Sequence, residues 1–189
     1  MKEVEDLYEL PEDLPEPTDD GACDHLPGML LPPVTLPATS GETVDPSKLP
    51  GRTVIYCYPL TGRPDEKLPR EWDDIPGARG CTPQSCAFRD HHAELQNLDA
   101  RVFGLSTQST GYQREAAERL HLPFRLLSDD KLAFVKALNL PNFEVEGMTL
   151  VKRLTLVIHN GRIETVFYPV FPPGENAREV LGWLHRGAG

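Results

Sequence analysis

Short apolar runs divide the chain into strand-like segments. Residues 53–58 (TVIYCY), 102–106 (VFGLS) and 124–127 (FRLL) are rich in β-branched and aromatic residues, a composition that favours buried strands. Two further runs, 154–158 (LTLVI) and 163–168 (IETVFY), flank a short segment that contains Asn-Gly, and this pattern predicts a β-hairpin. We therefore expect three single strands followed by an antiparallel pair.

Helix-starting signals fall between and after these runs. Side chains that cap a first turn predict helices beginning at four places: Thr82-Pro83, Thr110 with Gln113, Asp129-Asp130, and Asn176 with Glu179. The first helix should run through Leu95 or Leu98, and the second should end near Leu120.

The order of these elements indicates an α/β fold. Strands and helices alternate, which favours parallel strands with helices on both faces of the sheet. The closing hairpin adds an antiparallel strand, so the central sheet should be mixed. This is the layout of a thioredoxin-like fold with additions, and its body should start near Leu30.

Composition divides the chain into an acidic tail and a neutral body. With 189 residues, 39% apolar and 25% charged, the chain is long enough for one globular domain. Residues 1–27 hold ten acidic residues and one basic residue, so nearly all of the net charge of −10 lies there. We expect residues 1–28 to form a solvated or loosely docked acidic, proline-containing tail, and residues 29–189 to form the domain. A neutral body without a basic stripe argues against nucleic acid as a partner.

The cellular context follows from signals that the sequence lacks. No apolar run approaches the length of about 18 residues that a membrane-spanning helix requires, and no basic segment followed by an apolar stretch marks an export signal. We therefore expect a cytoplasmic protein without a membrane partner, in which the four cysteines are kept reduced: Cys23, Cys57, Cys81 and Cys86. In such a chain a close pair of cysteines is more often catalytic or metal-binding than a structural disulfide.

The strongest chemical signal is the segment of residues 80–86 (GCTPQSC). Cys81 stands at the start of a predicted helix, where free N–H groups and the helix dipole favour negative charge. This position favours the thiolate, which is the reactive form of cysteine. The alternative interpretation is a small buried hydrophobic residue, the usual role of a lone cysteine. The glycine before Cys81 and a second thiol nearby favour reactivity.

The spacing of Cys81 and Cys86 bears on two other thiol chemistries. Dithiol exchange of the thioredoxin type requires C-x-x-C, whereas this pair forms C-x4-C. A zinc site would have to recruit His91 or His92, but residues five apart on a helix differ by about 140° in azimuth, so these groups do not converge. A zinc site is therefore not expected, the spacing differs from the thioredoxin type, and both histidines are interpreted as helix-surface residues.

Three segments, TVIYCYP, GCTPQSCAFRD and VKRLTLVIHNGRI, resemble the peroxiredoxins, specifically the Q type or bacterioferritin comigratory protein group. The resemblance covers residues 29–184 approximately, and it implies a thiol peroxidase. Cys81 matches the peroxidatic cysteine, and Cys86 matches the resolving cysteine on the same helix. Arg153 matches the arginine that pairs with the thiolate and the peroxide, and Pro59 matches the proline that begins the active-site motif.

The chain departs from the family's motif between Pro59 and Cys81. The motif runs proline, three residues, threonine, two residues, cysteine. Here 21 residues separate the two ends, and Ala78 occupies the threonine position. Thr61 or Thr82 is a candidate to supply the missing hydroxyl.

The remaining candidates carry weaker signals. The loop of residues 60–80, which contains a tryptophan, is interpreted as surface elaboration. Cys57 lies in a predicted strand and should fill the core, and Cys23, surrounded by carboxylates that disfavour a thiolate, receives no catalytic role. Arg89 and Asp90 should form a local pair, unless Arg89 braces the active site.

The resemblance implies a complete reaction cycle. The Cys81 thiolate reduces hydrogen peroxide or an organic hydroperoxide and becomes a sulfenic acid. Cys86 then forms an intramolecular disulfide with it, and thioredoxin or a similar dithiol reductant reopens that bond. No metal, flavin or haem cofactor is needed. Two alternatives remain: a thiol–disulfide oxidoreductase without peroxidase activity, and a peroxide-sensing protein whose Cys81–Cys86 switch alters a partner-binding surface.

Overall fold

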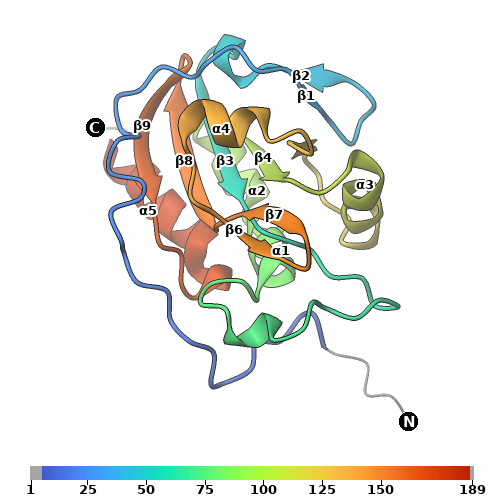
Figure 1. Cartoon of the computed structure of the whole chain (residues 1–189). Coiled ribbons are helices and arrows are strands. Elements are labelled where there is room, and N and C mark those ends of the chain that lie inside the picture. The colour runs from blue at the N-terminus through green and yellow to red at the C-terminus, as the bar shows by residue number, and fades with distance from the viewer. Residues whose placement is uncertain (1–5, 188–189) are drawn as a thin grey trace.

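A mixed five-stranded sheet forms the centre of the molecule (Figure 1). The computed structural model describes residues 6–187. The strand order is β5-β4-β3-β8-β9, with the bounds Arg52–Cys57 (β3), Ala100–Ser106 (β4), Leu126–Ser128 (β5), Leu154–His159 (β8) and Arg162–Phe167 (β9). Strands β3, β4 and β5 are parallel, whereas β8 pairs antiparallel with both β3 and β9. The expected mixed sheet, with a closing antiparallel hairpin, is confirmed.

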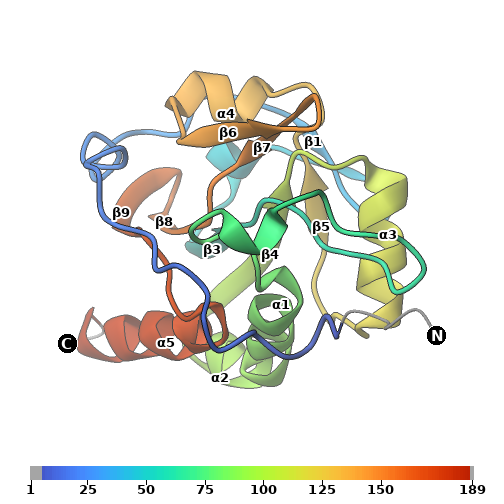
Figure 2. The same cartoon turned by 60° about the horizontal axis from the view of Figure 1, so that its bottom comes forward.

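Helices cover both faces of this sheet (Figure 2). On one face lie α1 (Cys81–Asp90), α2 (His92–Asn97) and α5 (Asn176–Gly187); on the other lies α4 (Ala133–Leu138), while α3 (Thr110–Arg119) lies beside β5. The alternation of side chains along β3 explains this arrangement. Val54 and Tyr56 pack on the α1 and α5 side, and Ile55 and Cys57 pack on the α4 side. Between residues 6 and 187, no helix is long and apolar enough to cross a membrane.

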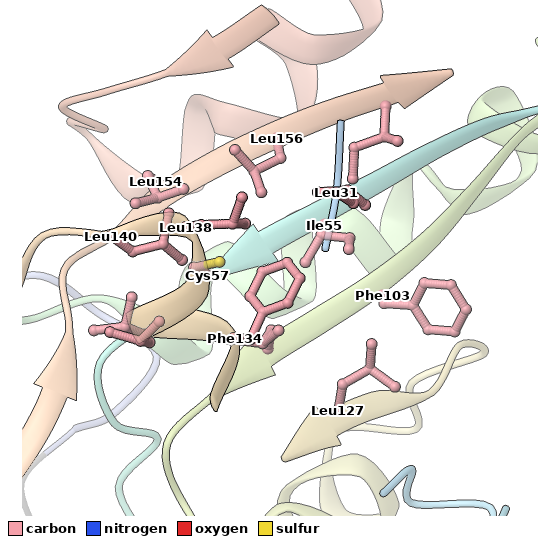
Figure 3. Packing of buried hydrophobic residues seen from close by; sticks show 14 of the residues in the cluster. Leu31, Ile55, Cys57, Phe103, Leu127, Phe134, Leu138, Leu140, Leu154 and Leu156 are labelled. Atoms are coloured by element: carbon pink, nitrogen blue, oxygen red, sulfur yellow. The ribbon is translucent and has the colours of Figure 1, made fainter. Parts of the chain in front are cut away.

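The α4 side of the sheet is packed with apolar side chains (Figure 3). Ile55 and Cys57 of β3 are fully buried in one cluster with Phe134 and Leu138 of α4 and Leu156 of β8. Burying each large apolar side chain contributes about 1.5–3 kcal/mol. The core role predicted for Cys57 is confirmed.

Two small hairpins that the sequence pattern does not predict lie outside the central sheet. They are β1 (Leu36–Pro37) with β2 (Thr43–Val44), and β6 (Asn142–Val145) with β7 (Met148–Val151). Glu146 and Gly147 both have positive φ, as the tight turn between β6 and β7 requires. Strand β7 ends two residues before Arg153, so this hairpin leads directly to a predicted site residue.

The loop of residues 60–80 has a small core of its own. Trp72 is 3% exposed and packs with Ala78 and Leu150, and its ring centroid lies 6.1 Å from that of Phe143. The interpretation of this loop as surface elaboration is therefore wrong for Trp72, because the β6–β7 hairpin offers the large ring an apolar surface to cover.

The N-terminal strap, residues 6–22, lies along the body of the molecule (Figure 2). Leu7 is 9% exposed, and the Asp20 carboxylate accepts a hydrogen bond from the Tyr168 hydroxyl at 2.9 Å. The chain then enters the core at Cys23 and Leu26. The strap is docked more closely than the sequence suggests, because apolar residues are interspersed among its acidic ones. The division of the chain at residue 28 stays a prediction.

Two helices start one residue or more before the predicted position. Helix α1 begins at Cys81 with Gly80 as its N-cap, and not at Thr82. Helix α3 is capped by the Ser109 side chain, and not by Thr110. The first predicted helix is also divided, since α1 ends before α2 begins. In α1 a glycine in a left-handed conformation replaces the expected side-chain cap.

Candidate active site

The start of α1 places Cys81 at the first helical position. The N-cap Gly80 has a φ of 112°, a left-handed conformation that residues with side chains rarely adopt. A Cβ there would lie 2.6 Å from Pro173 Cγ, so glycine is required on both grounds. Within the described part of the chain, residues 6–187, no side chain caps this helix start. Its first-turn N–H groups and dipole therefore favour a negative charge beside them.

Arg153 reaches Cys81 from the connection between β7 and β8. Its Nη2 donates a hydrogen bond to Cys81 Sγ at 3.1 Å. The same nitrogen donates to the Ala78 carbonyl at 2.9 Å, and Nε donates to the Gly77 carbonyl at 3.2 Å. Cys81 and Arg153 are each 3% exposed. A buried guanidinium in contact with the sulfur is placed to stabilise negative charge there, because opposite charges attract more strongly away from water.

A chain of buried side chains fixes the other side of the Arg153 guanidinium. Nη1 donates to Gln84 Oε1, and Gln84 Nε2 donates to Asn176 Oδ1 at 3.0 Å. Thr155 Oγ1 donates to the same Asn176 oxygen at 2.6 Å. Gln84, Thr155 and Asn176 are fully buried. Helix α1, strand β8 and helix α5 therefore jointly set the direction of the guanidinium.

Asn176 does not have the role that the sequence predicts for it. The sequence predicts that Asn176 caps the last helix together with Glu179. Instead, its side-chain oxygen Oδ1 accepts hydrogen bonds from the side chains of Gln84 and Thr155. Within residues 6–187, its Nδ2 has no hydrogen-bond partner. The sequence did not identify Gln84, Thr155 or Asn176 as residues of the site. Only Gln84 carried a usable signal, since it lies three positions after Cys81 on the same side of a helix.

Aromatic side chains form the wall behind Cys81 and belong to the same packed cluster. The Tyr56 ring stacks on Phe88 with centroids 4.5 Å apart, and its hydroxyl donates to Ser85 Oγ at 3.0 Å. Burial raises the pKa of Tyr58 to about 12 and raises the pKa of Tyr56 well above its ordinary value. Both phenols are therefore neutral near pH 7, and Arg153 supplies the charge next to the sulfur.

Cys86 lies half-buried on the same helix as Cys81, and both thiols are free. Desolvation by burial raises the pKa of the Cys86 thiol, and the charge of Arg89 opposes this effect. Residues five apart on a regular helix have Cα atoms roughly 8–9 Å apart, beyond the limit of about 7 Å for a disulfide. The structure thus brings Cys81 and Arg153 together, while helix α1 keeps Cys86 apart from Cys81.

Pro59 and Thr61 follow the end of β3 and are buried. Gln108 holds Thr61 in place: its Oε1 accepts from the Thr61 N–H at 3.0 Å, and its Nε2 donates to the Thr61 carbonyl at 3.4 Å. Thr82 is also buried, in the first turn of α1. Ala78, at the family's threonine position, packs its methyl group into the small core of the loop. Which hydroxyl faces a peroxide stays a prediction.

The other two cysteines lie on the opposite face of the sheet from Cys81. Burial raises the pKa of Cys57 above its ordinary value. Burial, reinforced by Asp20 and Asp19, raises the pKa of Cys23 to about 12. Neutral buried thiols are poor nucleophiles, which agrees with the core role of Cys57 and with the lack of a predicted role for Cys23.

Arg89 forms the local pair that was predicted with Asp90, with Nε 2.9 Å from Oδ1. It also donates from Nη1 to a carbonyl at the end of α3 at 2.8 Å, so it connects α1 to α3. Its charge acts on Cys86. His91 and His92 lie partly exposed on the helix surface, as predicted.

Comparison with known proteins supports one family assignment. The Redoxin family model matches residues 26–181. The chain is 34% identical over 159 residues to the chloroplastic peroxiredoxin Q of Sedum lineare, covering 83% of this chain and 76% of that protein. It is 31% identical over 141 residues to peroxiredoxin Bcp of Bacillus subtilis, covering 72% of this chain and 80% of that protein. The crystal structure of peroxidoxin BcpB from Mycobacterium tuberculosis is similar with a TM-score of 0.69 at 25% identity, covering 86% of this chain and 98% of that chain.

These similarities extend over the sheet, the helices and the segment that joins Cys81 to Arg153. They confirm the expected thioredoxin-like fold with peroxiredoxin-type additions. The matched region begins within the acidic N-terminal segment, after the strap, and ends in α5. The chain therefore belongs to the redoxin family and, within it, to the Q-type peroxiredoxins, which are thiol peroxidases.

Proposed function

We propose that the chain reduces hydrogen peroxide and organic hydroperoxides with Cys81 as its peroxidatic thiolate. The sulfur attacks the terminal oxygen of the hydroperoxide, the O–O bond breaks, and the sulfur is oxidised to a sulfenic acid. The hydroxide or alkoxide that leaves takes a proton from solvent and becomes water or an alcohol. The observation that carries this proposal is the 3.1 Å contact between Arg153 Nη2 and Cys81 Sγ at the start of a helix.

Two kinds of donor support the attack. The Arg153 guanidinium and the N–H groups at the start of α1 stabilise the thiolate before the reaction. They also stabilise the peroxide oxygen that gains negative charge in the transition state. The carbonyls of Gly77 and Ala78 and the side chain of Gln84 hold the guanidinium in place in the substrate-free protein, so little reorganisation is required. Pro59 is proposed to shape the turn that closes this side of the site.

Cys86 is proposed as the resolving cysteine. Its thiol condenses with the Cys81 sulfenic acid, so that a sulfur–sulfur bond forms and one water molecule leaves. The Cα separation along α1 is too long for this bond, so the first turns of the helix must unwind. Pro83 makes unwinding easier because it supplies no N–H group to that turn.

A dithiol protein, thioredoxin or one similar to it, is proposed to restore both thiols by exchange. Its thiolate attacks the Cys81–Cys86 disulfide, a mixed disulfide forms, and the reductant leaves as its own disulfide. The cytoplasm is the proposed compartment, since a reducing environment keeps such a cycle running. Neither a membrane nor a nucleic acid is a proposed partner.

Peroxide consumption coupled to thioredoxin and its reductase tests this function. Cys81→Ser should abolish turnover. Cys86→Ser should reduce about one equivalent of peroxide, be trapped as the sulfenic acid, and recycle poorly. Cys57→Ala is the matched control, because it removes a buried thiol on the other face of the sheet, and its turnover should equal that of the unaltered protein.

Mass spectrometry of the peroxide-treated protein should locate a disulfide between Cys81 and Cys86. Activity retained in Cys81→Ser would refute the assignment. A single oxidation without turnover would instead favour the peroxide sensor, and disulfide exchange without peroxide consumption would favour the oxidoreductase.

A further inference from the structure

The N-terminal strap and the loop of residues 60–80 meet beside Cys81. The N-terminal strap precedes the matched family region, which starts at residue 26. The loop of residues 60–80 is longer than the spacing of the family's active-site motif. Figure 2 shows the strap crossing in front of α1 on its way to the β9 side of the molecule.

The strap lies close against the backbone of the loop. A Cβ at Gly62 would lie 2.9 Å from Leu7 Cδ2, and a Cβ at Gly80 would lie 3.2 Å from Leu10 Cδ2. Leu7 is 9% exposed and Leu10 is half-buried, so these contacts bury apolar surface. The strap therefore contacts the residue that directly precedes Cys81.

Arg79 joins the strap to the loop. Its Nη2 donates to the Asp6 carbonyl at 2.8 Å, and its Nη1 lies 3.0 Å from Asp73 Oδ1. The Arg79 side chain is 9% exposed, a low value for arginine. Such charge-assisted bonds are among the stronger ones in proteins, and the planar guanidinium holds both partners in one geometry.

The same stretch of backbone holds Arg153. Of its hydrogen bonds to backbone carbonyls, the Arg153 guanidinium donates the two shortest to Gly77 and Ala78. The Arg79 carbonyl lies 3.4 Å from Nη2. A shift of these carbonyls therefore turns Nη2 away from Cys81 Sγ. Displacements of about 1 Å are large enough to reduce a reaction rate up to a hundredfold.

We propose that Arg79 is a positioning residue for the peroxidatic site. By joining the strap to the loop, it holds the carbonyls of residues 77–79 where they aim the Arg153 guanidinium at Cys81. The proposal rests on the proposed function in one respect, since it takes Cys81 as the reacting thiolate. The strap then helps to set the position of the Arg153 guanidinium.

Alkylation of the reduced protein by iodoacetamide, followed at Cys81 as a function of pH, tests this role. In Arg79→Ala the alkylation profile should move to higher pH by about one unit, so that the rate on the acidic limb of the profile falls about tenfold. Peroxide reduction should slow by a similar factor. Arg79→Lys should restore part of the loss, because an ammonium retains the pair with Asp73 but does not reproduce the fork that reaches both partners.

Arg63→Ala is the matched control. Arg63 lies in the same loop, but its charged partners are Glu66 and Glu115, and neither belongs to the strap or to residues 77–80. Its alkylation profile should equal that of the unaltered protein. A profile that moves in Arg63→Ala as far as in Arg79→Ala would overturn the proposal, because the effect would then be a general loosening of the loop.

A second variant keeps Arg79 and releases the strap. Leu7→Ser combined with Leu10→Ser in the full chain should shift the profile in the same direction. Adding Arg79→Ala to it should give no further shift, since both changes break one connection. An unchanged profile, or fully additive shifts, would overturn the proposal. Because alkylation uses no peroxide, a shifted profile in a protein that does not consume peroxide would refute the proposed function alone.

Discussion

Cys81 and Cys57 are both buried thiols, at 3% and 0% exposure, and they lie on opposite faces of one sheet. The sulfur of Cys81 faces the guanidinium of Arg153 at the start of a helix. Cys57 stands in strand β3 among apolar side chains, and burial raises its pKa. The two environments differ in what contacts the sulfur and hardly at all in burial. A buried thiol becomes a nucleophile only where the protein supplies charge and donors for its anion.

The alternation of strand β3 separates the two environments. Tyr56 and Tyr58 point to the side of Cys81, and Cys57 between them points to the side of α4. A register shift of one residue would exchange these faces. Because both faces are packed, the register is strongly specified, and the neutral phenols stay behind the reactive sulfur.

Removing the positive charge of Arg153 should abolish most of the difference in reactivity between Cys81 and Cys57. Arg153→Ala is expected to slow peroxide reduction about 10²–10³-fold, the range seen when one donor to a developing anion is removed. The variant also removes the hydrogen bonds that Arg153 donates to the carbonyls of Gly77 and Ala78, so a lower melting temperature should accompany the lower rate. Stopped-flow measurement of the single-turnover rate checks this.

Arg101→Ala is the control for this experiment, since that arginine bonds the Pro50 carbonyl far from Cys81 in an exposed position. Its rate should equal that of the unaltered protein. An unchanged peroxide rate in Arg153→Ala would remove Arg153 from the reaction and leave the helix start as the sole source of stabilisation.

Oxidation should change the surroundings of Cys81 and leave those of Cys57 as they are. If the Cys81–Cys86 disulfide requires α1 to unwind, amides from Gln84 to Arg89 should lose hydrogen-exchange protection in the oxidised protein. Strand β3, held between β4 and β8, should keep its protection. Equal protection of α1 in both redox states, with the disulfide present, would show that no unwinding occurs.

The neutral thiols on the α4 side should make the fold sensitive to alkaline pH. The pKa of Cys23 is raised to about 12 in the folded chain, against about 8.5 for an exposed cysteine. Its contribution to stability is therefore complete below about pH 8.5 and is lost as the pH rises toward 12, because only the unfolded chain releases the proton. The decline is at most about 1.4 kcal/mol per pH unit. Urea unfolding at several alkaline pH values should show a shallower decline in Cys23→Ala, and an equal slope in both proteins would contradict this.

Local patterns in the sequence predict most of the sheet and the position of Cys81. The runs at 53–58 and 154–158 became β3 and β8 within a residue of their expected bounds. The hairpin turn follows from Asn160 and Gly161, which both adopt positive φ. These local patterns predict the structure correctly because they depend only on residues a few positions apart in the chain. The small hairpins and the buried Trp72 were missed because short strands in a polar context carry no clear periodicity.

What the sequence by itself determined is most of the central sheet, the approximate starts of several helices and the placement of a thiol at a helix start, since alternation, capping and turn residues act over a few positions. The resemblance to a known family indicated Arg153, but only the tertiary structure decided which buried amides and loop carbonyls hold its guanidinium against that thiol. Arg153, Gln84 and Asn176 come from three separated parts of the chain, and Arg79 joins a strap to a loop. Contacts of this kind depend on how the sheet and helices pack, because packing and not sequence spacing sets the distance between side chains from different elements.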